Sequence, residues 1–279
     1  MKKVIIFVVV FLMITNLFPQ TDSKTGLVFG GGGALGFAHV GVIQALEEAG
    51  LKIDYVSGSS MGAIIGALYA YGHTSENIVR FIEEKKLNKL RSIATINIFR
   101  KDGLSNHKKV SKILDAILPV DHYDSLKRNF TLTMTDLQNI KTIYVSSGDK
   151  LKLNIMASSS LPMLFEPVKI EGILYVDGGV LNNLPIEPLL DSCNKIIMID
   201  LCNPHIQTLK KGKMGLFRRI IDAMMYEGNL DRISKADHYI IFKSLDGYGV
   251  LDFKHYKDII RIGYEGMKNY IAAHPEILE

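Results

Sequence analysis

Short apolar runs alternate with longer amphipathic stretches along most of the chain. The short runs are almost continuously apolar, which is typical of strands buried on both faces of a sheet, and the longer stretches repeat apolar residues at helical spacing. These patterns predict strands at 26–29, 52–57, 130–135, 142–147, 173–176 and 195–201. They predict helices at 34–49, 61–72, 76–91 and 151–158. Such an alternating order predicts an α/β fold with a mainly parallel central sheet flanked by helices on both faces.

The first residues have a different character from the rest. Lys2 and Lys3 precede an apolar run at 4–18, and polar residues follow at 20–24. This order is typical of a secretory signal peptide, and an uncleaved anchor is the alternative, although the run is shorter than the ~20 residues of a spanning helix. We therefore predict a signal peptide or N-terminal anchor at 1–22 and one domain at 23–279. The leader predicts export across the inner membrane, to a periplasmic, secreted or membrane-associated location.

Composition narrows the class of partner. The chain has 279 residues, 22% of them charged, and a formal net charge of +4, of which Lys2 and Lys3 contribute two. Nucleic-acid-binding domains usually carry a strongly basic surface, so we do not expect nucleic acid as a partner. These patterns carry no signal for the oligomeric state.

A serine lies in a sharp glycine-bounded turn between a predicted strand and a predicted helix. The turn reads Gly58-Ser59-Ser60-Met61-Gly62 and fits the G-x-S-x-G pattern of a nucleophile elbow. Strand and helix pass so close at such a turn that only small residues fit beside the serine. Ser60 is therefore the candidate nucleophile, with Gly58 and Gly62 as its supporting glycines.

A second glycine-rich turn follows the first predicted strand. It begins at Gly30 and continues as Gly31, Gly32 and Gly33 to the start of a predicted helix. Unpaired backbone N–H groups at such a helix start can bind a phosphate or a developing oxyanion. The loop has no lysine and does not fit a P-loop, but 31–36 (GGGALG) also fits a dinucleotide fingerprint, with Asp54 about twenty residues further on.

An aspartate followed by two glycines completes the candidate chemistry. Asp177, Gly178 and Gly179 come directly after a short predicted strand. A serine hydroxyl needs a base within about 2.6–3.2 Å to accept its proton, and burial would raise the pKa of an aspartate toward a useful value. Asp-Gly is also a common turn dipeptide, so Asp177 alone admits a purely structural interpretation.

Four blocks in one order closely resemble the patatin-like phospholipase family. They are 31–36 (GGGALG), 58–62 (GSSMG), 157–162 (ASSSLP), and 176–180 (VDGGV) followed by 182–185 (NNLP). The resemblance extends from about residue 26 to about residue 201. It implies a three-layer α/β sandwich and a patatin-like phospholipase domain at 23–279.

The resemblance also implies a mechanism, namely hydrolysis of ester bonds in phospholipids or other acyl lipids. Ser60 would be the nucleophile, Asp177 its base in a serine–aspartate dyad, and Gly31, Gly32 and Gly33 the oxyanion hole. Gly36 completes the glycine loop. The family has an arginine where this chain has Leu35, so no cation is expected from the loop.

Two other interpretations stay open at this point. A triad esterase of the α/β-hydrolase type would need one of His205, His238, His255 and His274, whereas His39 is interpreted as a packing residue. A lipid-binding or nucleotide-binding protein on the same scaffold would have no activity. No histidine or cysteine spacing fits a metal site, so we expect neither a metal nor a cofactor, and we expect the substrate at a membrane surface.

Overall fold

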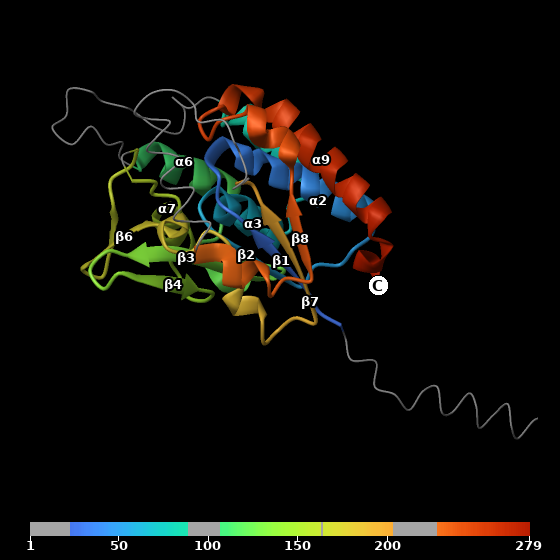
Figure 1. Cartoon of the computed structure of the whole chain (residues 1–279). Coiled ribbons are helices and arrows are strands. Elements are labelled where there is room, and N and C mark those ends of the chain that lie inside the picture. Colours follow the sequence, from blue (N-terminus) through green and yellow to red (C-terminus); the bar gives the residue numbers. More distant parts are fainter. Residues whose placement is uncertain (1–22, 89–106, 163, 203–227) are drawn as a thin grey trace, which may run out of the picture.

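The computed structural model describes residues 23–88, 107–162, 164–202 and 228–279 (Figure 1). Its strands are β1 (Thr25–Phe29), β2 (Tyr55–Gly58), β3 (Asn129–Asp136), β4 (Lys141–Val145), β5 (Val168–Ile170), β6 (Ile173–Asp177), β7 (Lys195–Asp200) and β8 (His238–Ile241). Its α-helices are α2 (Ala38–Glu48), α3 (Met61–Tyr71), α4 (Ser75–Glu84), α6 (Lys108–Ile117), α7 (Leu151–Ser158) and α9 (Tyr256–Ala273). Short 3₁₀ helices include η1 (Gly33–Phe37), η3 (Gly178–Val180) and η4 (Glu187–Leu189).

The strands form one 8-stranded sheet of mixed direction, in the order β5-β6-β3-β2-β1-β7-β8, with β4 paired to β3. Neighbouring strands among β3, β2, β1, β7 and β8 run parallel, as the alternating pattern predicts. The remaining strands β4, β5 and β6 pair antiparallel at the β3 end of the sheet. The α/β fold is thus confirmed, with the parallel strands as the main body of the sheet.

The central strands bury side chains on both faces of the sheet. On β1, Leu27 and Phe29 belong to the core beneath α2, α3 and α9, whereas Val28 belongs to a second core on the opposite face. The second face is covered by the segment that contains η4 and by the helical residues 228–233 with the chain that follows them. Because successive side chains point to opposite faces, a strand covered on both sides needs apolar residues throughout.

Two helices far apart in the sequence lie side by side over the first core. Figure 1 shows α2 and α9 running along each other at one side of the molecule. A Cβ atom at Gly263 would lie 2.1 Å from the backbone oxygen of Ala38, and one at Gly41 would lie 2.0 Å from the oxygen of Ile260. Glycine on both helices therefore allows the two backbones to come into contact.

Each predicted strand and helix corresponds to an element of the structure; the helix predicted at 151–158 is α7 with the same ends, and each of the others has at least one end shifted by one or more residues. The predicted helix at 34–49 begins as η1 before it becomes α2, and the helix predicted at 76–91 is α4, which ends at Glu84. The sequence pattern did not predict α6, α9, β5 and β8. The predicted leader at 1–22 lies outside the described residues. Within the described ranges, no helix combines the length and the apolar character needed to cross a membrane.

The topology gathers the candidate residues at one edge of the sheet. The glycine loop follows β1 and the serine turn follows β2, both at the carboxyl ends of parallel strands. Gly58 at the end of β2 pairs with Leu132 of β3, and Asp177 at the end of β6 pairs with Met134, two residues further along β3. The three candidate turns therefore meet at the edge where α/β sheets usually place their ligands.

Candidate active site

Ser60 lies at a strained turn that only small neighbours permit. Its backbone has φ 54° and ψ −123°, in a region that residues with a side chain rarely adopt. A Cβ atom on Gly58 would lie 2.5 Å from the backbone oxygen of Gly62, and one on Gly62 would lie 2.2 Å from that of Phe29. The two glycines therefore let β1, the turn and α3 pack against one another while the turn presents Ser60.

Ser60 and Asp177 are in direct contact. The Ser60 hydroxyl donates a hydrogen bond of 2.6 Å to Oδ2 of Asp177, which is only 3% exposed. The other carboxylate oxygen accepts from the backbone N–H of Gly179 at 2.8 Å. The backbone N–H of Asp177 donates to the Ser160 carbonyl at 3.1 Å. The carboxylate of Asp177 is thus held in place, with one of its oxygens accepting from the Ser60 hydroxyl and the other from Gly179.

Burial makes Asp177 a stronger base than an ordinary aspartate. Loss of water raises the pKa of its carboxyl group to about 6, while the hydrogen bonds from Ser60 and Gly179 offset part of that rise. A carboxylate with this pKa is ionised at neutral pH and accepts a proton more readily than an exposed aspartate. The pair therefore has the geometry and the basicity for proton transfer from serine.

The glycine loop lies beside Ser60, since a Cβ atom on Gly31 would lie 3.0 Å from that of Ser60. Within the described part of the chain, neither the N–H of Gly32 nor that of Gly33 has a protein acceptor. The N–H of Gly31 instead donates to Oδ1 of Asn183 at 3.1 Å, and the N–H of Ser60 donates to the Ser158 hydroxyl at 3.1 Å. Of the three glycines predicted as oxyanion donors, Gly32 and Gly33 are those with a free amide.

The remaining motif glycines allow close packing around the site. A Cβ atom on Gly36 would lie 2.2 Å from Cγ of Met61, and one on Gly178 would lie 2.4 Å from the backbone oxygen of Thr133. One on Gly179 would lie 2.8 Å from Oδ1 of Asn183. Leu35, which replaces the family arginine, is buried in the core and brings no cation to the loop.

Sequence reasoning missed two residues that bind the glycine loop. Nε2 of His39 donates to the Gly30 carbonyl at 2.8 Å, and burial lowers the pKa of this imidazole to about 4, so it is neutral. Asn183 binds both the N–H and the carbonyl of Gly31. Asn183 belongs to one of the motif blocks, but its residue type alone does not indicate which backbone groups it contacts.

The dinucleotide interpretation of the glycine loop does not fit the structure. A ribose-binding acidic residue would be needed near the carboxyl end of β2. Asp54 instead precedes β2, where its carboxylate accepts from the N–H of Thr25 and pairs with Lys52. It therefore lies at the opposite end of the strand from the glycine loop.

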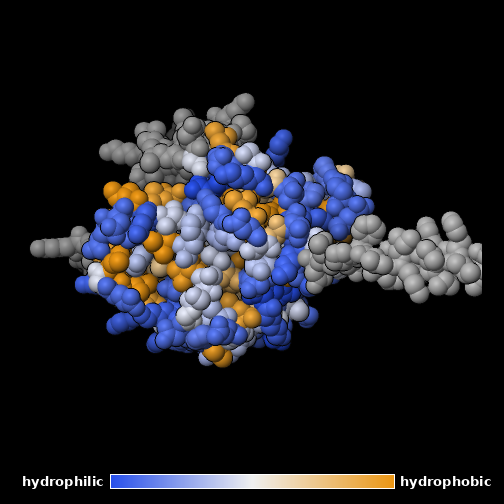
Figure 2. All heavy atoms as spheres, turned by 90° about the horizontal axis from the view of Figure 1, so that it is seen from below, coloured by the Kyte–Doolittle hydropathy of each residue, from blue (hydrophilic) through white to orange (hydrophobic). Residues whose placement is uncertain are grey.

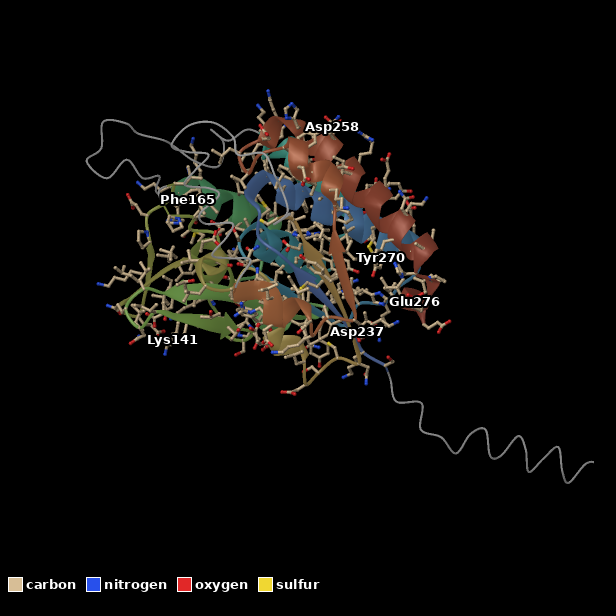
Figure 3. All side chains as sticks on the ribbon, viewed as in Figure 1. Lys141, Phe165, Asp237, Asp258, Tyr270 and Glu276 are labelled. Carbon is tan, nitrogen blue, oxygen red and sulfur yellow. The ribbon has the colours of Figure 1, made fainter. Side chains whose placement is uncertain are left out.

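Two of the three described candidate histidines of a triad have polar partners away from Ser60 and Asp177. His238 bonds to the Tyr270 hydroxyl at 3.1 Å, and His274 lies 3.1 Å from Glu276. Figure 3 shows Tyr270 and Glu276 toward one side of the molecule. His238 is the first residue of β8, so it lies at the end of the parallel strands opposite to the Ser60 turn. His255 packs against Tyr248, and its buried Nδ1 has no hydrogen-bond partner among the described residues. His205 lies outside the described residues.

Among the described ranges, no cluster of histidine, cysteine or acidic residues could hold a metal ion.

Comparison with known proteins identifies the family. The family model "Patatin-like phospholipase" matches residues 27–190, more than half of the chain. The chain belongs to the patatin-like phospholipase family. The matched region contains the glycine loop, the serine turn and the aspartate turn, so the resemblance noted in the sequence is confirmed.

Relatives of this patatin-like protein differ in length. An uncharacterized NTE family protein of Mycobacterium tuberculosis is 34% identical over 174 residues, which cover 61% of this chain and 46% of that protein. A protein named lysophospholipase nte1 from Aspergillus fumigatus is 26% identical over 276 residues, 88% of this chain and 18% of that protein. The chain thus spans less than half the length of these relatives.

Among solved structures, VipD from Legionella pneumophila is similar with a TM-score of 0.51 and 14% sequence identity. The match covers 91% of this chain and 67% of VipD. At this level of identity, the likeness supports the patatin-like fold and nothing further.

The raised pKa of Asp177 predicts how stability depends on pH. In the unfolded chain an aspartate titrates near 3.9, so between about pH 4 and pH 6 the unfolded chain releases this proton while the folded protein retains it, and ionisation lowers the free energy of unfolding. Asp177→Asn cannot ionise. We expect the difference between its free energy of unfolding and that of the parent to increase in favour of Asp177→Asn, by on the order of 2–3 kcal/mol between about pH 4 and pH 6. Above about pH 6 this difference should stay constant.

Urea denaturation of both proteins at several pH values from 4 to 8 measures this difference. If the difference were constant across the range, Asp177 would titrate like an exposed aspartate, and the account of its basicity would be wrong.

Proposed function

We propose that this chain hydrolyses carboxylic ester bonds of phospholipids or other acyl lipids with a Ser60–Asp177 dyad. The observation that carries the proposal is the 2.6 Å hydrogen bond from the Ser60 hydroxyl to a buried carboxylate. Membership of the patatin-like phospholipase family supports the reaction class. The dyad needs no histidine, because the carboxylate itself accepts the serine proton.

In the first half of the reaction, Ser60 Oγ attacks the ester carbonyl carbon while its proton moves to Oδ2 of Asp177. Negative charge develops on the carbonyl oxygen, where the N–H groups of Gly32 and Gly33 stabilise it. The C–O bond to the leaving alcohol then breaks, and Asp177 returns the proton to the alcohol oxygen. An acyl group remains bound to Ser60.

In the second half, water attacks the acyl carbon and gives a proton to Asp177. The same amides stabilise the second oxyanion, and collapse of this intermediate breaks the bond to Ser60 Oγ, which recovers the proton. The released fatty acid then ionises in solution. Asp177 therefore serves as base and acid in turn, which suits a carboxyl group with a pKa of about 6.

The name lysophospholipase of the Aspergillus relative supports a lipid substrate for this chain. Export through a leader at 1–22, either cleaved as a signal peptide or retained as an anchor, would bring the enzyme to an envelope or an external membrane. The apolar run at 4–18 supports this part of the proposal.

Exposed apolar side chains beside the site support contact with lipid. The backbones of Ser160 and Gly179 form hydrogen bonds with Asp177, and the backbone of Val250 forms one with the N–H of Ala34 after the glycine loop. An exposed apolar residue directly follows each of these three residues. These residues, which we call the apolar rim, are Leu161, Val180 and Leu251, with exposures of 40%, 44% and 50%. Figure 2 shows the underside of the molecule as a mixture of hydrophilic and hydrophobic patches. An apolar rim would favour acyl chains at the entrance.

Replacement of the dyad residues tests the proposed activity. We expect Ser60→Ala and Asp177→Asn each to lower fatty-acid release from phospholipid vesicles, and hydrolysis of a short-chain nitrophenyl ester, by ~10³-fold or more, because each removes a partner of the proton transfer. His205→Ala should retain the parent rate. Full activity in Ser60→Ala, or its loss in His205→Ala, would contradict the dyad.

Polar substitution of the apolar rim tests the lipid interface. We expect the combined variant Leu161→Ser, Val180→Ser, Leu251→Ser to hydrolyse vesicle phospholipid about 10-fold more slowly, because apolar area is lost where lipid enters. Its rate on a soluble short-chain ester should remain close to that of the parent.

Leu278→Ser is the matched control, since Leu278 is exposed to a similar extent, 42%, near the C-terminal end of the chain. An equal loss on both substrates, or an equal effect of the control, would argue against the rim as a lipid contact.

A further inference from the structure

We propose that Asn183, together with His39, acts as a positioning residue that sets the orientation of the oxyanion amides. The inference rests on the proposed function, because it concerns the donors of that same site. Both side chains are buried, and among the described residues neither forms a hydrogen bond with the Ser60 hydroxyl, which donates to Asp177. They act on the glycine loop instead, through hydrogen bonds to consecutive peptide groups.

The peptide between Gly30 and Gly31 is held at both ends. Its carbonyl accepts from Nε2 of His39 at 2.8 Å, and its N–H donates to Oδ1 of Asn183 at 3.1 Å. A carbonyl can only accept, so the single proton of the neutral imidazole lies on Nε2 of His39. The C=O and N–H of a trans peptide point in opposite directions, so the two side chains together define the plane of this peptide.

The next peptide carries the N–H of Gly32. Its carbonyl, that of Gly31, accepts from Nδ2 of Asn183 at 3.3 Å. The N–H of Gly32 must therefore point away from Asn183, on the opposite side of the peptide plane. One amide side chain thus occupies the N–H of Gly31 and directs the N–H of Gly32 outward as a free donor.

Glycine makes such a restraint necessary. Consecutive glycines have no side chains to limit their backbone, so each peptide of the loop can rotate at little steric cost. Rotation of the peptide between Gly31 and Gly32 would exchange the donor N–H for the carbonyl oxygen. A carbonyl at that place would repel the oxyanion that the amide stabilises.

Asn183 also sets the spacing between the glycine loop and the Asp177 turn. A Cβ atom at Gly31 would lie 2.5 Å from Oδ1 of Asn183, and one at Gly179 would lie 2.8 Å from the same oxygen. The amide side chain is therefore packed between the glycine loop and the turn whose Gly179 N–H holds Asp177. A change of its size or hydrogen bonding would move the oxyanion donors relative to the dyad.

The test compares Asn183→Leu with Asn182→Leu in the full chain. Asn182 is an equally buried neighbour, but its side chain bonds to Tyr144, Glu187 and the N–H of Leu184, away from the glycine loop. We expect Asn183→Leu to lower kcat on a short-chain nitrophenyl ester about 100-fold with KM changed less than about threefold. Inhibition by an aryl trifluoromethyl ketone, whose adduct with serine carries an oxyanion, should weaken by a similar factor.

Asn182→Leu should lower the urea midpoint but keep kcat and inhibitor affinity within about threefold of the parent. Equal losses of kcat in the two variants, or an unchanged kcat in Asn183→Leu, would overturn the proposal. If Asn183→Leu does not fold, Asn183→Asp replaces it, because an ionised aspartate can accept from the N–H of Gly31 but cannot donate to its carbonyl. Its kcat must then fall at pH values above the pKa of the introduced carboxyl group.

Hydrogen exchange at the Gly31 amide gives a readout that needs no substrate. Protection should be present in the parent and in Asn182→Leu and lost in Asn183→Leu. Protection that persists in Asn183→Leu would contradict the proposal that Asn183 restrains the Gly31 peptide. An active Ser60→Ala variant would instead contradict the proposed function, and it would leave the hydrogen-exchange result unaffected.

Discussion

The hydrogen bond between Ser60 and Asp177 is the interaction on which the rest of the site depends. It joins residues 117 positions apart at a distance of 2.6 Å, and each partner is placed by a different strand of one sheet. β2 delivers the serine through a strained turn, and β6 delivers the aspartate two residues further along their shared neighbour β3. The mixed topology of the sheet is therefore part of the site, because β6 must end where the parallel strands place the serine.

This arrangement has an energetic cost that the surrounding core offsets. Ser60 adopts an unfavourable backbone conformation, and Asp177 keeps an ionisable carboxyl group out of water. The central strands β1 and β7 compensate by burying apolar side chains on both faces of the sheet. The α2–α9 pair covers one of these faces, with its backbones in contact at glycine positions. A rigid scaffold of this kind can hold a strained turn and a buried carboxylate in one geometry.

Much of the fold could be predicted from the sequence, because the centres of β1 and β7 are continuously apolar and the helices between strands repeat apolar residues at helical spacing. The helix α9 was missed, and it contains Gly263, a residue that usually weakens helices and is used here for contact with Ala38. Ser60 and Asp177 could be singled out from their glycine-rich turns, and the structure places them in contact. The partners of individual amides could not, since the contact between Gly31 and Asn183 joins residues 152 positions apart and depends on how the two turns pack.

The central claim is that a buried carboxylate alone activates Ser60. The most direct measurement is the pH dependence of the second-order rate at which a fluorophosphonate labels Ser60. The account predicts a single rise with a midpoint near pH 6, set by Asp177 and unchanged in variants of the histidines. A midpoint near pH 4, or a profile that shifts or disappears when a histidine is replaced, would contradict it.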